Sequence, residues 1–358
     1  MNVFVHLAHD KDVVKWRQGW QDGKLVGRND PTPYGYGRAE QMGCRITYSQ
    51  AAPENSLRKL VRLGLRVILG FDLLHAYHQR QAIRDADVVW THTESQFLGV
   101  AALLPKSGGP KVIAQSVWLF DRWDRLNILH KWLYARLIRR LDVLTFHSTA
   151  NMAVARRAFP EKDCRLVPFG IPSEQMTAPR PRSGDGLTVI APGSDRHRDW
   201  ATLVEAVSAI PAATTTILSG TAPKHLAQGR PAVSIHRART NEEMNRYFAS
   251  AHTVCVPLKP NKHASGITVI QEAVLAGVPV VASAAGGLEG YFGPDEITFV
   301  PPGDVPALSH ALRAIERDPE AALAMARRAQ EKMKRDAMGA ETYVRRHVEI
   351  SRELLNRP

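Results

Sequence analysis

The sequence has few cysteines and no long apolar run. Its 358 residues include only Cys44, Cys164 and Cys255, which are far apart and lack the spacing of a disulfide framework or a zinc site. We therefore expect no disulfide and no bound metal.

Prolines interrupt the longest uncharged stretches, residues 206–223 and 273–288, and a bilayer span needs about 20 mainly apolar residues. We expect no transmembrane helix.

The N-terminus lacks the apolar segment of a secretory signal. Its opening residues, MNVFVHLAH, are followed at once by acids and lysines, so the apolar run is too short for a signal peptide. We therefore expect a cytoplasmic protein that could also bind peripherally at the inner face of the membrane.

Basic residues outnumber acidic residues, and the excess of positive charge lies mainly in the N-terminal half of the chain. The formal net charge is +12; residues 1–170 hold 25 Lys and Arg against 15 Asp and Glu, whereas the rest hold 22 against 20. Two basic amphipathic stretches lie in this half, SLRKLVRLGLRVILGF and LNILHKWLYARLIRRL. They suit an anionic membrane surface, and equally a core-facing helix with a solvated basic face. Their basic residues are Arg58, Lys59, Arg62, Arg66, Lys131, Arg136, Arg139 and Arg140.

Short β-branched segments alternate with longer amphipathic ones along the chain. This rhythm is typical of parallel α/β sheets, so we expect an α/β fold. The composition, 44% hydrophobic and 23% charged, is that of a globular protein, and the length favours two domains. The strand-like segments lie at residues 2–8, 87–92, 111–117, 142–148, 187–193, 214–220, 252–258 and 278–283.

The rhythm breaks at FGIPSEQMTAPRPRSGDG, where prolines, glycines and polar residues accumulate without periodicity. We expect an N-terminal domain at residues 1–170, a linker at 171–186 and a C-terminal domain at 187–335. The tail at residues 336–358 has the pattern of an amphipathic helix, and we expect it to pack back on the N-terminal domain.

Ligands of open parallel α/β sheets bind beyond the carboxyl ends of the strands, and one loop there leads into an apolar helix with a single acid. Ser265, Gly266, Ile267 and Thr268 precede VIQEAVLAG. Free amides at a helix N-terminus, beside a glycine, suit a phosphate or a sugar hydroxyl. The carboxylate of Glu272 can accept two hydrogen bonds from a ribose diol; an acid that only supports the helix fits equally.

A second loop, SDRHRDW, follows the strand-like segment LTVIAPG. Gly193 and Ser194 begin it, and Arg196 and Arg198 follow. Because the planar fork of arginine matches a diphosphate, the loop predicts a pyrophosphate clamp. A solvated basic loop is comparably compatible with the sequence.

The candidate residues of the N-terminal half are less specific. Gly35 and Gly37 bracket Tyr36 in a loop whose amides could face a phosphate, although two glycines more often mark a plain turn. Polar residues also follow two strand-like segments, and they could line an acceptor site; a structural histidine is the default alternative. These residues are His92, Glu94, Gln115 and Ser116.

The stretch GITVIQEAVLAGVPVVASAAGGLEG, residues 266–290, resembles the donor-site signature of GT-B glycosyltransferases, especially the large retaining family 4. The family form is Glu, seven residues, Glu, an Ala-rich helix, Gly-x-Pro-Val-Val and a Gly-Gly turn. Glu272 matches the second glutamate, which holds the ribose in that family. The first falls at Ala264, or at His263 with one extra residue, so the sequence departs from the family there. Without that glutamate, backbone amides and the side chain of Lys262 are the groups expected to contact the donor sugar.

Other segments extend the resemblance. GSDRHRDWATLVEA resembles the diphosphate loop, with Arg198 in the place of its lysine, and PYGYGRAE resembles the glycine pair that faces the diphosphate. The resemblance implies two Rossmann-like domains facing across a cleft, and a donor phosphate that acts as base toward the acceptor. It implies no cofactor other than a UDP- or GDP-linked sugar as co-substrate. The candidate catalytic residues are Arg198, Glu94 and His92.

We therefore predict a retaining glycosyltransferase that moves a sugar from a nucleoside diphosphate sugar to a glycan or lipid-linked acceptor in bacterial polysaccharide synthesis. Two alternatives stay open. A nucleotide-sugar epimerase of the same fold needs acid and base groups that converge on the sugar. A non-catalytic basic module would bind anionic lipid or nucleic acid, although no nucleic-acid-binding motif occurs and we expect no nucleic acid partner.

Overall fold

The computed structural model describes residues 1–181 and 186–357, which group into two compact units. The expected linker at residues 171–186 therefore lies partly outside the described residues. The N-terminal unit comprises Met1–Gln21, Asp30–Pro168 and Glu341–Pro358, and the C-terminal unit comprises Asp22–Asn29 and Phe169–Ala340.

The N-terminal unit is built on a parallel sheet of six strands in the order β2-β1-β3-β4-β5-β6. The strands are β1 (Asn2–His6), β2 (Arg45–Tyr48), β3 (Val88–Thr91), β4 (Lys111–Ser116), β5 (Val143–Phe146) and β6 (Asp163–Leu166). The helices are α1 (Val13–Gln21), α2 (Ser56–Leu69), α3 (Leu73–His78), α4 (Arg80–Asp85), α5 (Glu94–Leu103), α6 (Ile128–Ile138), α7 (Thr149–Ala158) and α13 (Ala340–Leu355), with short 3-10 helices at Pro33–Met42, Leu119–Asp121 and Trp123–Arg125.

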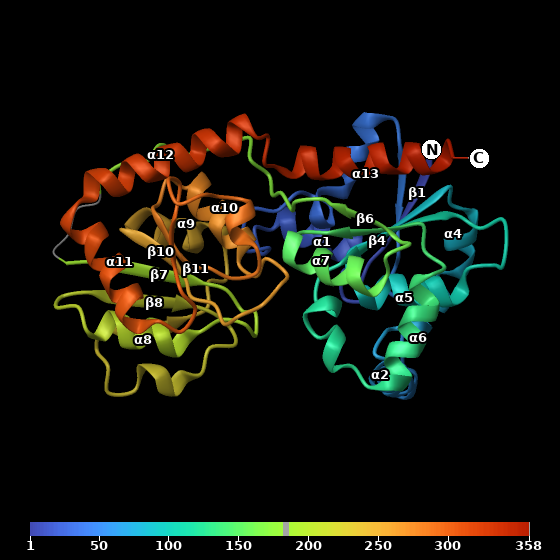
Figure 1. The fold of residues 1–358 in the computed structure, drawn as a ribbon, viewed down its shortest axis with the longest axis horizontal. Helices are drawn as coiled ribbons and strands as arrows, with labels where there is room; N and C mark the ends of the chain where they lie inside the picture. The colour runs from blue at the N-terminus through green and yellow to red at the C-terminus, as the bar shows by residue number, and fades with distance from the viewer. Residues whose placement is uncertain (182–185, 358) are drawn as a thin grey trace. The chain divides into compact units, whose positions relative to one another are not determined.

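Helix α13 packs on this unit although it comes from the far end of the chain, as its red ribbon in Figure 1 shows. Tyr343, His347 and Ser351 recur every four residues, so they share one side of the helix. The indole Nε1 of Trp90 donates to the hydroxyl of Ser351 at 2.8 Å, and the hydroxyls of Tyr36 and Tyr343 lie 2.8 Å apart. The tail is therefore held by buried polar contacts as well as by apolar ones.

The C-terminal unit repeats the architecture with the strand order β12-β11-β10-β7-β8-β9. The strands are β7 (Thr188–Pro192), β8 (Thr214–Leu218), β9 (Val233–His236), β10 (Thr253–Val256), β11 (Val280–Ser283) and β12 (Thr298–Val300). The helices are α8 (Trp200–Ser208), α9 (Asn241–Ser250), α10 (Ile267–Leu275), α11 (Val305–Arg317) and α12 (Pro319–Arg335), with short 3-10 helices at Lys224–Ala227 and Leu288–Gly290.

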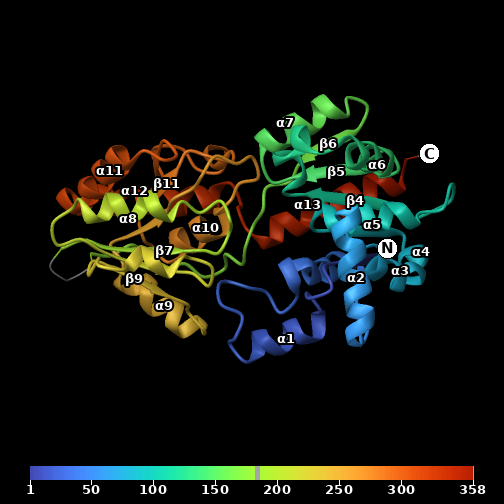
Figure 2. The ribbon, with the colours of Figure 1, turned by 90° about the horizontal axis from the view of Figure 1, so that it is seen from below.

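Both faces of the second sheet are covered. Successive side chains of a strand point to opposite faces. Val254 and Val256 of β10 pack into the core that contains residues of α9 and α10, whereas Cys255 between them packs into the core beneath α8 and α11. Figure 2 shows α8 and α9 on opposite sides of the strands. Burial on both faces explains why β7, β10 and β11 are mainly apolar in the sequence.

The eight strand-like segments expected from the sequence all form strands, and they occupy the interior of both sheets. Four further strands, β2, β6, β9 and β12, were not expected, and each of them is a sheet edge. Among the described residues, no helix is both long enough and apolar enough to cross a bilayer.

Buried histidines of the N-terminal unit predict a loss of stability at acid pH. Burial lowers the pKa of His75 and of His347 to about 4, and holds the pKa of His6 and of His92 well below the ordinary 6.5. Between these values the unfolded chain binds more protons than the folded one, so the free energy of unfolding falls as the pH falls through this window.

We expect the urea midpoint, followed by circular dichroism, to fall steadily from about pH 7 to about pH 5. The variant His347→Gln should show a shallower pH dependence, because one of these groups is gone. A midpoint that stays constant across this range would contradict the prediction.

Candidate functional site

Two loops of the C-terminal unit meet beyond the carboxyl ends of β7 and β10. One runs from the end of β7 to α8, and the other runs from the end of β10 to α10. The amide of Lys259 donates to the carbonyl of His197 at 2.7 Å, and the amide of Asp199 donates to the carbonyl of Pro257 at 3.0 Å. These backbone hydrogen bonds tie the two loops together, so their side chains are held in a fixed relation.

The side chain of Arg198 lies between two glycines of these loops. A Cβ atom on Gly193 (φ +139°) would stand 2.4 Å from its Nε, and one on Gly266 (φ +86°) would stand 3.2 Å from its Nη1. Any larger residue at Gly193 would collide with the guanidinium, and the positive φ at both positions favours glycine. The guanidinium therefore lies directly against the backbone at the N-terminus of α10.

The guanidinium of Arg198 is buried, and the charge of Asp195 compensates it only in part. The residue is 5% exposed, and its Nε and Nη1 have no hydrogen-bond partner among the described residues. Burial lowers the pKa of Arg198 to about 10, partly offset by the negative charge of Asp195, so the group stays protonated at neutral pH. A buried charge without partners is costly. This arrangement, beside a helix N-terminus, is suited to an anion.

Asp195 and two histidines line the same loops. The imidazole Nδ1 of His197 lies 3.0 Å from Asp195 Oδ1, and the imidazole Nε2 of His263 lies 3.5 Å from Asp195 Oδ2. Burial would raise the pKa of Asp195, but hydrogen bonds from His263 and from the His197 amide hold it below its ordinary range. The sequence interpretation did not assign Asp195 or His197 to the site, although both lie within SDRHRDW.

Glu272 lies in α10, one turn beyond the N-terminus of the helix, and it is 7% exposed. Burial raises its pKa, and the amide and the charge of Arg28 partly offset that effect. Gly266 caps the helix with φ +86°, and no side chain caps it. The first amides of α10 are therefore not covered by a capping side chain.

Residues Asp22–Asn29, which we call the strap, belong to the C-terminal unit although they precede it by some 140 residues of sequence. The amide of Arg28 donates to Glu272 Oε1 at 2.8 Å, and the amide of Gly27 donates to the side-chain oxygen of Asn241 at 2.8 Å. Arg28 Nη1 donates to the carbonyl of Gln175 at 2.7 Å. The strap thus holds one oxygen of the Glu272 carboxylate.

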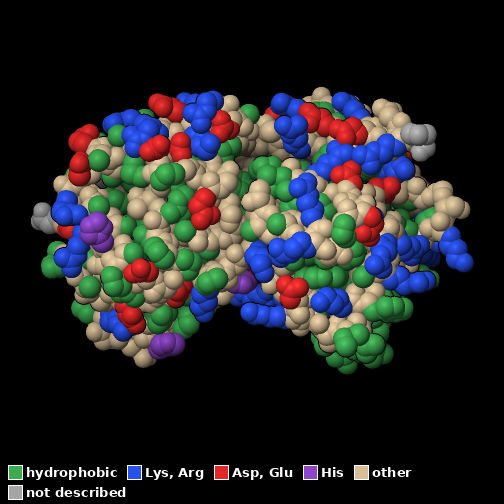
Figure 3. Space-filling view, viewed as in Figure 1, with side chains coloured by type: hydrophobic (Ala, Val, Ile, Leu, Met, Phe, Trp, Pro, Cys, Tyr) green, Lys and Arg blue, Asp and Glu red, His purple; other side chains and the backbone are tan. Residues whose placement is uncertain are grey.

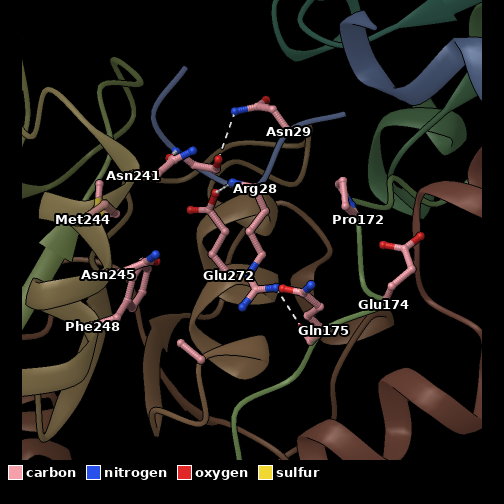
Figure 4. Close-up of a pocket in the computed structure, with 12 residues that line it drawn as sticks. Arg28, Asn29, Pro172, Glu174, Gln175, Asn241, Met244, Asn245, Phe248 and Glu272 are labelled. Atoms are coloured by element: carbon pink, nitrogen blue, oxygen red, sulfur yellow. Dashed lines mark hydrogen bonds between the residues drawn. The ribbon is translucent and has the colours of Figure 1, made fainter. Parts of the chain in front are cut away.

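A cavity of about 310 Å³ opens beside this carboxylate. Figure 4 shows the second oxygen of Glu272 directed away from Arg28. Side chains of α9, the strap and the segment 172–175 complete the wall, so the cavity combines amide groups with apolar surface. The lining residues are Gly27, Arg28, Asn29, Pro172, Glu174, Gln175, Asn241, Met244, Asn245, Phe248, Glu272 and Ala276.

The other predicted donor residues lie on the same two loops with different exposure. Ser194 and Arg196 are exposed, and Lys262 and Thr268 are half-buried. Ser265 is buried with its Oγ unpartnered among the described atoms, and Ile267 packs in the core. The structure therefore brings Gly193, Arg198, Ser265 and Gly266 around one point, whereas the side chain of Arg196 faces solvent.

The predicted glycine loop is a 3-10 segment whose glycine amides are already used. The amide of Gly35 donates to the carbonyl of Thr32 at 3.1 Å, and the amide of Gly37 donates to Thr32 Oγ1 at 3.0 Å. Tyr36 is fully buried, with its hydroxyl 3.1 Å from His92 Nδ1. The two glycines therefore shape a turn that buries a tyrosine.

The polar candidates of the N-terminal unit are engaged in internal contacts. The His92 ring stacks on Tyr34 with centroids 3.4 Å apart. The Glu94 carboxylate accepts from the amides of Val117 and Trp118, and burial raises its pKa. The amide nitrogen of Gln115 donates to the Thr145 and Ser116 carbonyls, and Ser116 Oγ is buried without a partner among the described atoms.

Comparisons with known proteins bear on the family and the fold of the chain. The model of the family described as glycosyl transferases group 1 matches residues 187–318. A sucrose-phosphate synthase from Thermosynechococcus elongatus is similar over 99% of both chains, with 18% identity and a TM-score of 0.76. The Anabaena protein HepE, solved in complex with UDP, covers 98% of both chains, with 14% identity and a TM-score of 0.65. None of the curated proteins matches the sequence.

A third solved structure is described as trehalose-6-phosphate from E. coli bound with UDP-2-fluoro glucose. It is similar over 98% of both chains, with 11% identity and a TM-score of 0.68. The GT-B fold predicted from the sequence is thereby confirmed. The prediction of a glycosyltransferase is confirmed by the family match, which includes the loop that carries Arg198 and the helix that carries Glu272.

The unpaired charge of Arg198 predicts opposite effects on stability and on anion binding. The variant Arg198→Met removes a buried charge that lacks a partner, so we expect its thermal midpoint without ligand to be unchanged or higher. Binding of inorganic pyrophosphate, measured by calorimetry, should weaken at least about tenfold, because a hydrogen bond to a charged group contributes about 1.5–3 kcal/mol. The exposed Arg196→Met is the control, and an equal loss there would contradict the prediction.

The contact of the strap with Glu272 depends on a glycine. A Cβ atom on Gly27 (φ +102°) would stand 2.6 Å from Glu272 Oε1, whereas one on Gly23 meets nothing within 4 Å. We expect Gly27→Ala to accelerate hydrogen exchange of the Gly27 and Arg28 amides at least about tenfold, because their acceptors are lost. Gly23→Ala is the control and should leave these two amides protected; unchanged protection in Gly27→Ala would refute the contact.

Proposed function

We propose that this chain, whose residues 187–318 belong to the glycosyl transferases group 1, is a retaining glycosyltransferase that uses a UDP- or GDP-linked sugar. It transfers the sugar to a glycan or lipid-linked acceptor in bacterial polysaccharide synthesis. The donor binds in the C-terminal unit, at the loops that follow β7 and β10. The observation that carries this proposal is the buried, unpaired guanidinium of Arg198 at the N-terminus of α10.

A diphosphate is the ligand that this arrangement suits best. It supplies negative charge to the guanidinium and accepts hydrogen bonds from amides of the first turn of α10 after Ile267, whose own amide donates to the carbonyl of Ala264. In the transfer reaction, negative charge grows on the diphosphate as the bond to the sugar breaks. Positive charge that is already in place there stabilises the transition state without reorganisation, so Arg198 is the side chain to which we assign the main catalytic effect.

Glu272 supports the nucleoside part of the donor. Its Oε1 is held by the amide of Arg28, so the carboxylate is oriented before any ligand arrives, and its second oxygen is left for a ribose hydroxyl. Orientation in advance lowers the entropic cost of binding. HepE and the E. coli protein are described with UDP and UDP-2-fluoro glucose, which supports a uridine nucleotide for this chain.

The proton of the acceptor hydroxyl needs a base. The resemblance to retaining family 4 implies that an oxygen of the donor phosphate accepts this proton. The contacts of Glu94 and His92 are in keeping with that assignment, because the carboxylate is held by two backbone amides and the imidazole lies beneath Tyr34. We therefore assign these two residues to the support of the N-terminal unit and not to proton transfer.

The ribose role of Glu272 is testable by ligand-induced stabilisation. With wild-type protein and a panel of UDP-, GDP- and ADP-sugars, we expect one nucleotide class to raise the thermal midpoint; ligand at about one hundred times Kd stabilises by about 2.7 kcal/mol. Most of this shift should be lost in Glu272→Gln, which keeps the size of the side chain and removes its charge. Glu289→Gln changes an exposed acid of the same signature and should respond like the wild type.

Two results would overturn the assignment. Equal shifts in Glu272→Gln and in wild type would remove Glu272 from the ribose site. If the wild-type protein binds none of the nucleotide sugars, and neither hydrolyses nor transfers from any of them, the proposed function is wrong.

A further inference from the structure

Helix α2 (Ser56–Leu69) is oriented with its apolar side toward solvent. Leu60 is 68% exposed and Val67 is 81% exposed. The buried residue of this helix, which the structure describes throughout, is Arg62, with an exposure of 7%. An amphipathic helix of a globular domain normally turns its apolar stripe toward the core. In α2 this relation is reversed.

An ion-pair network fixes this orientation. Arg62 Nε lies 2.6 Å from Glu54 Oε1, and Arg62 Nη1 lies 2.7 Å from Asp72 Oδ2. Asp72 also accepts from the amide of His75 at the start of α3. The paired guanidinium anchors the middle of the polar side to the protein, while Arg58 and Arg66, one turn to either side, stay exposed. The apolar side is consequently left outside. Arg62, expected from the sequence at a membrane surface, is turned inward for this reason.

The start of helix α6 adds a second set of exposed apolar side chains. Ile128 is 85% exposed and Leu129 is 79% exposed. The two helices are joined at their ends, because His130 Nε2 lies 2.8 Å from the carbonyl of Ile68 and the Tyr134 hydroxyl donates to the carbonyl of Leu69 at 2.8 Å. The exposed side chains therefore belong to one surface. The apolar patch at the lower right of Figure 3 covers the region of α2 and α6 in Figure 1.

We propose that this surface, which we call the α2–α6 surface, docks on an anionic lipid membrane. Its insertion residues are Leu60, Val67, Ile68, Ile128, Leu129 and Trp132. Large exposed apolar patches mark interaction sites, and an apolar face with basic residues around it is the pattern of an interfacial membrane contact. Tryptophan in addition favours the headgroup region.

Charge identifies lipid as the occupant. Helices α2 and α6 contain no acidic residue, since they read SLRKLVRLGLRVIL and ILHKWLYARLI. Their exposed basic residues include Arg58, Lys59, Arg66 and Arg136. Anionic headgroups complement such a surface. Two copies of the chain would bring these like charges together, which is unfavourable.

Two other arginines expected at the membrane are engaged elsewhere. Arg139 lies 3.7 Å from Glu161, and Arg140 donates to the carbonyl of Ala101 at 2.7 Å. Both arginines stay exposed, so these contacts orient their side chains and leave their positive charge in place. This inference rests on the proposed function only in that the membrane would present a lipid-linked acceptor; the docking itself needs no donor.

Vesicle flotation of the full chain tests the docking. We expect the protein to float with phosphatidylcholine vesicles that contain about a third phosphatidylglycerol, and to float poorly with phosphatidylcholine alone. The triple variant Leu60→Gln, Val67→Gln, Ile128→Gln should lower the partition coefficient on the anionic vesicles at least about tenfold, because its side chains no longer favour insertion. Lys59→Gln with Arg66→Gln should lower it too and reduce its dependence on salt.

Matched controls separate docking from general charge or instability. Arg345→Gln with Arg346→Gln removes two exposed positive charges from α13, and Val14→Gln changes an exposed apolar residue of α1; both should float like the wild type. Thermal midpoints and nucleotide-sugar shifts of the α2–α6 variants should equal those of the wild type, which separates this result from the test of the donor site.

Several outcomes would overturn the proposal. One is equal flotation of the triple variant and the wild type, and another is an equal loss in the α13 control. A third is sedimentation of the wild type as a dimer that the triple variant abolishes, because the surface would then be an interface between copies of the chain.

Discussion

The site depends on one unsatisfied charge, the guanidinium of Arg198. Its burial is possible because Gly193 and Gly266 have no side chains, and its place is fixed because the loops after β7 and β10 are tied backbone to backbone. Covering a charge without a partner destabilises a fold. The fold tolerates that cost at the point where parallel strands and a helix N-terminus already favour an anion, so the incompletely compensated charge lies within the proposed donor site.

How much of the fold follows from sequence depends on where each strand lies. Interior strands such as β10 (Thr253–Val256) are buried on both faces, so their apolar runs are unmistakable in sequence. Edge strands such as β2 (Arg45–Tyr48) and β6 (Asp163–Leu166) have one neighbour and exposed positions, so they lack the continuous apolar run that marks a buried strand. All four strands that the sequence left undetected are edges, and their pairing is set by the neighbouring strand rather than by local pattern.

The candidate site could likewise be predicted only in part from the sequence. Gly266 and Glu272 could be proposed as donor-binding residues because their motif is contiguous, and spacing within a short segment reflects its local geometry. The strap could not be predicted, because the hydrogen bond from Arg28 to Glu272 joins residues 244 positions apart. The orientation of α2 was equally hidden, because amphipathic spacing defines two faces of a helix without saying which of them the protein covers.

Two buried arginines illustrate what a sequence pattern alone does not distinguish. Arg62 and Arg198 have almost equal exposure, 7% and 5%. Arg62 has two carboxylates within hydrogen-bond distance, so its charge is neutralised inside the protein and its effect is to orient a helix. Arg198 has no such partner among the described residues, although Asp195 lies in its loop. The carboxylate of Asp195 lies within 3.5 Å of two histidines and offsets the burial of Arg198 only in part; under the proposed function, the phosphates of the donor supply the remaining negative charge.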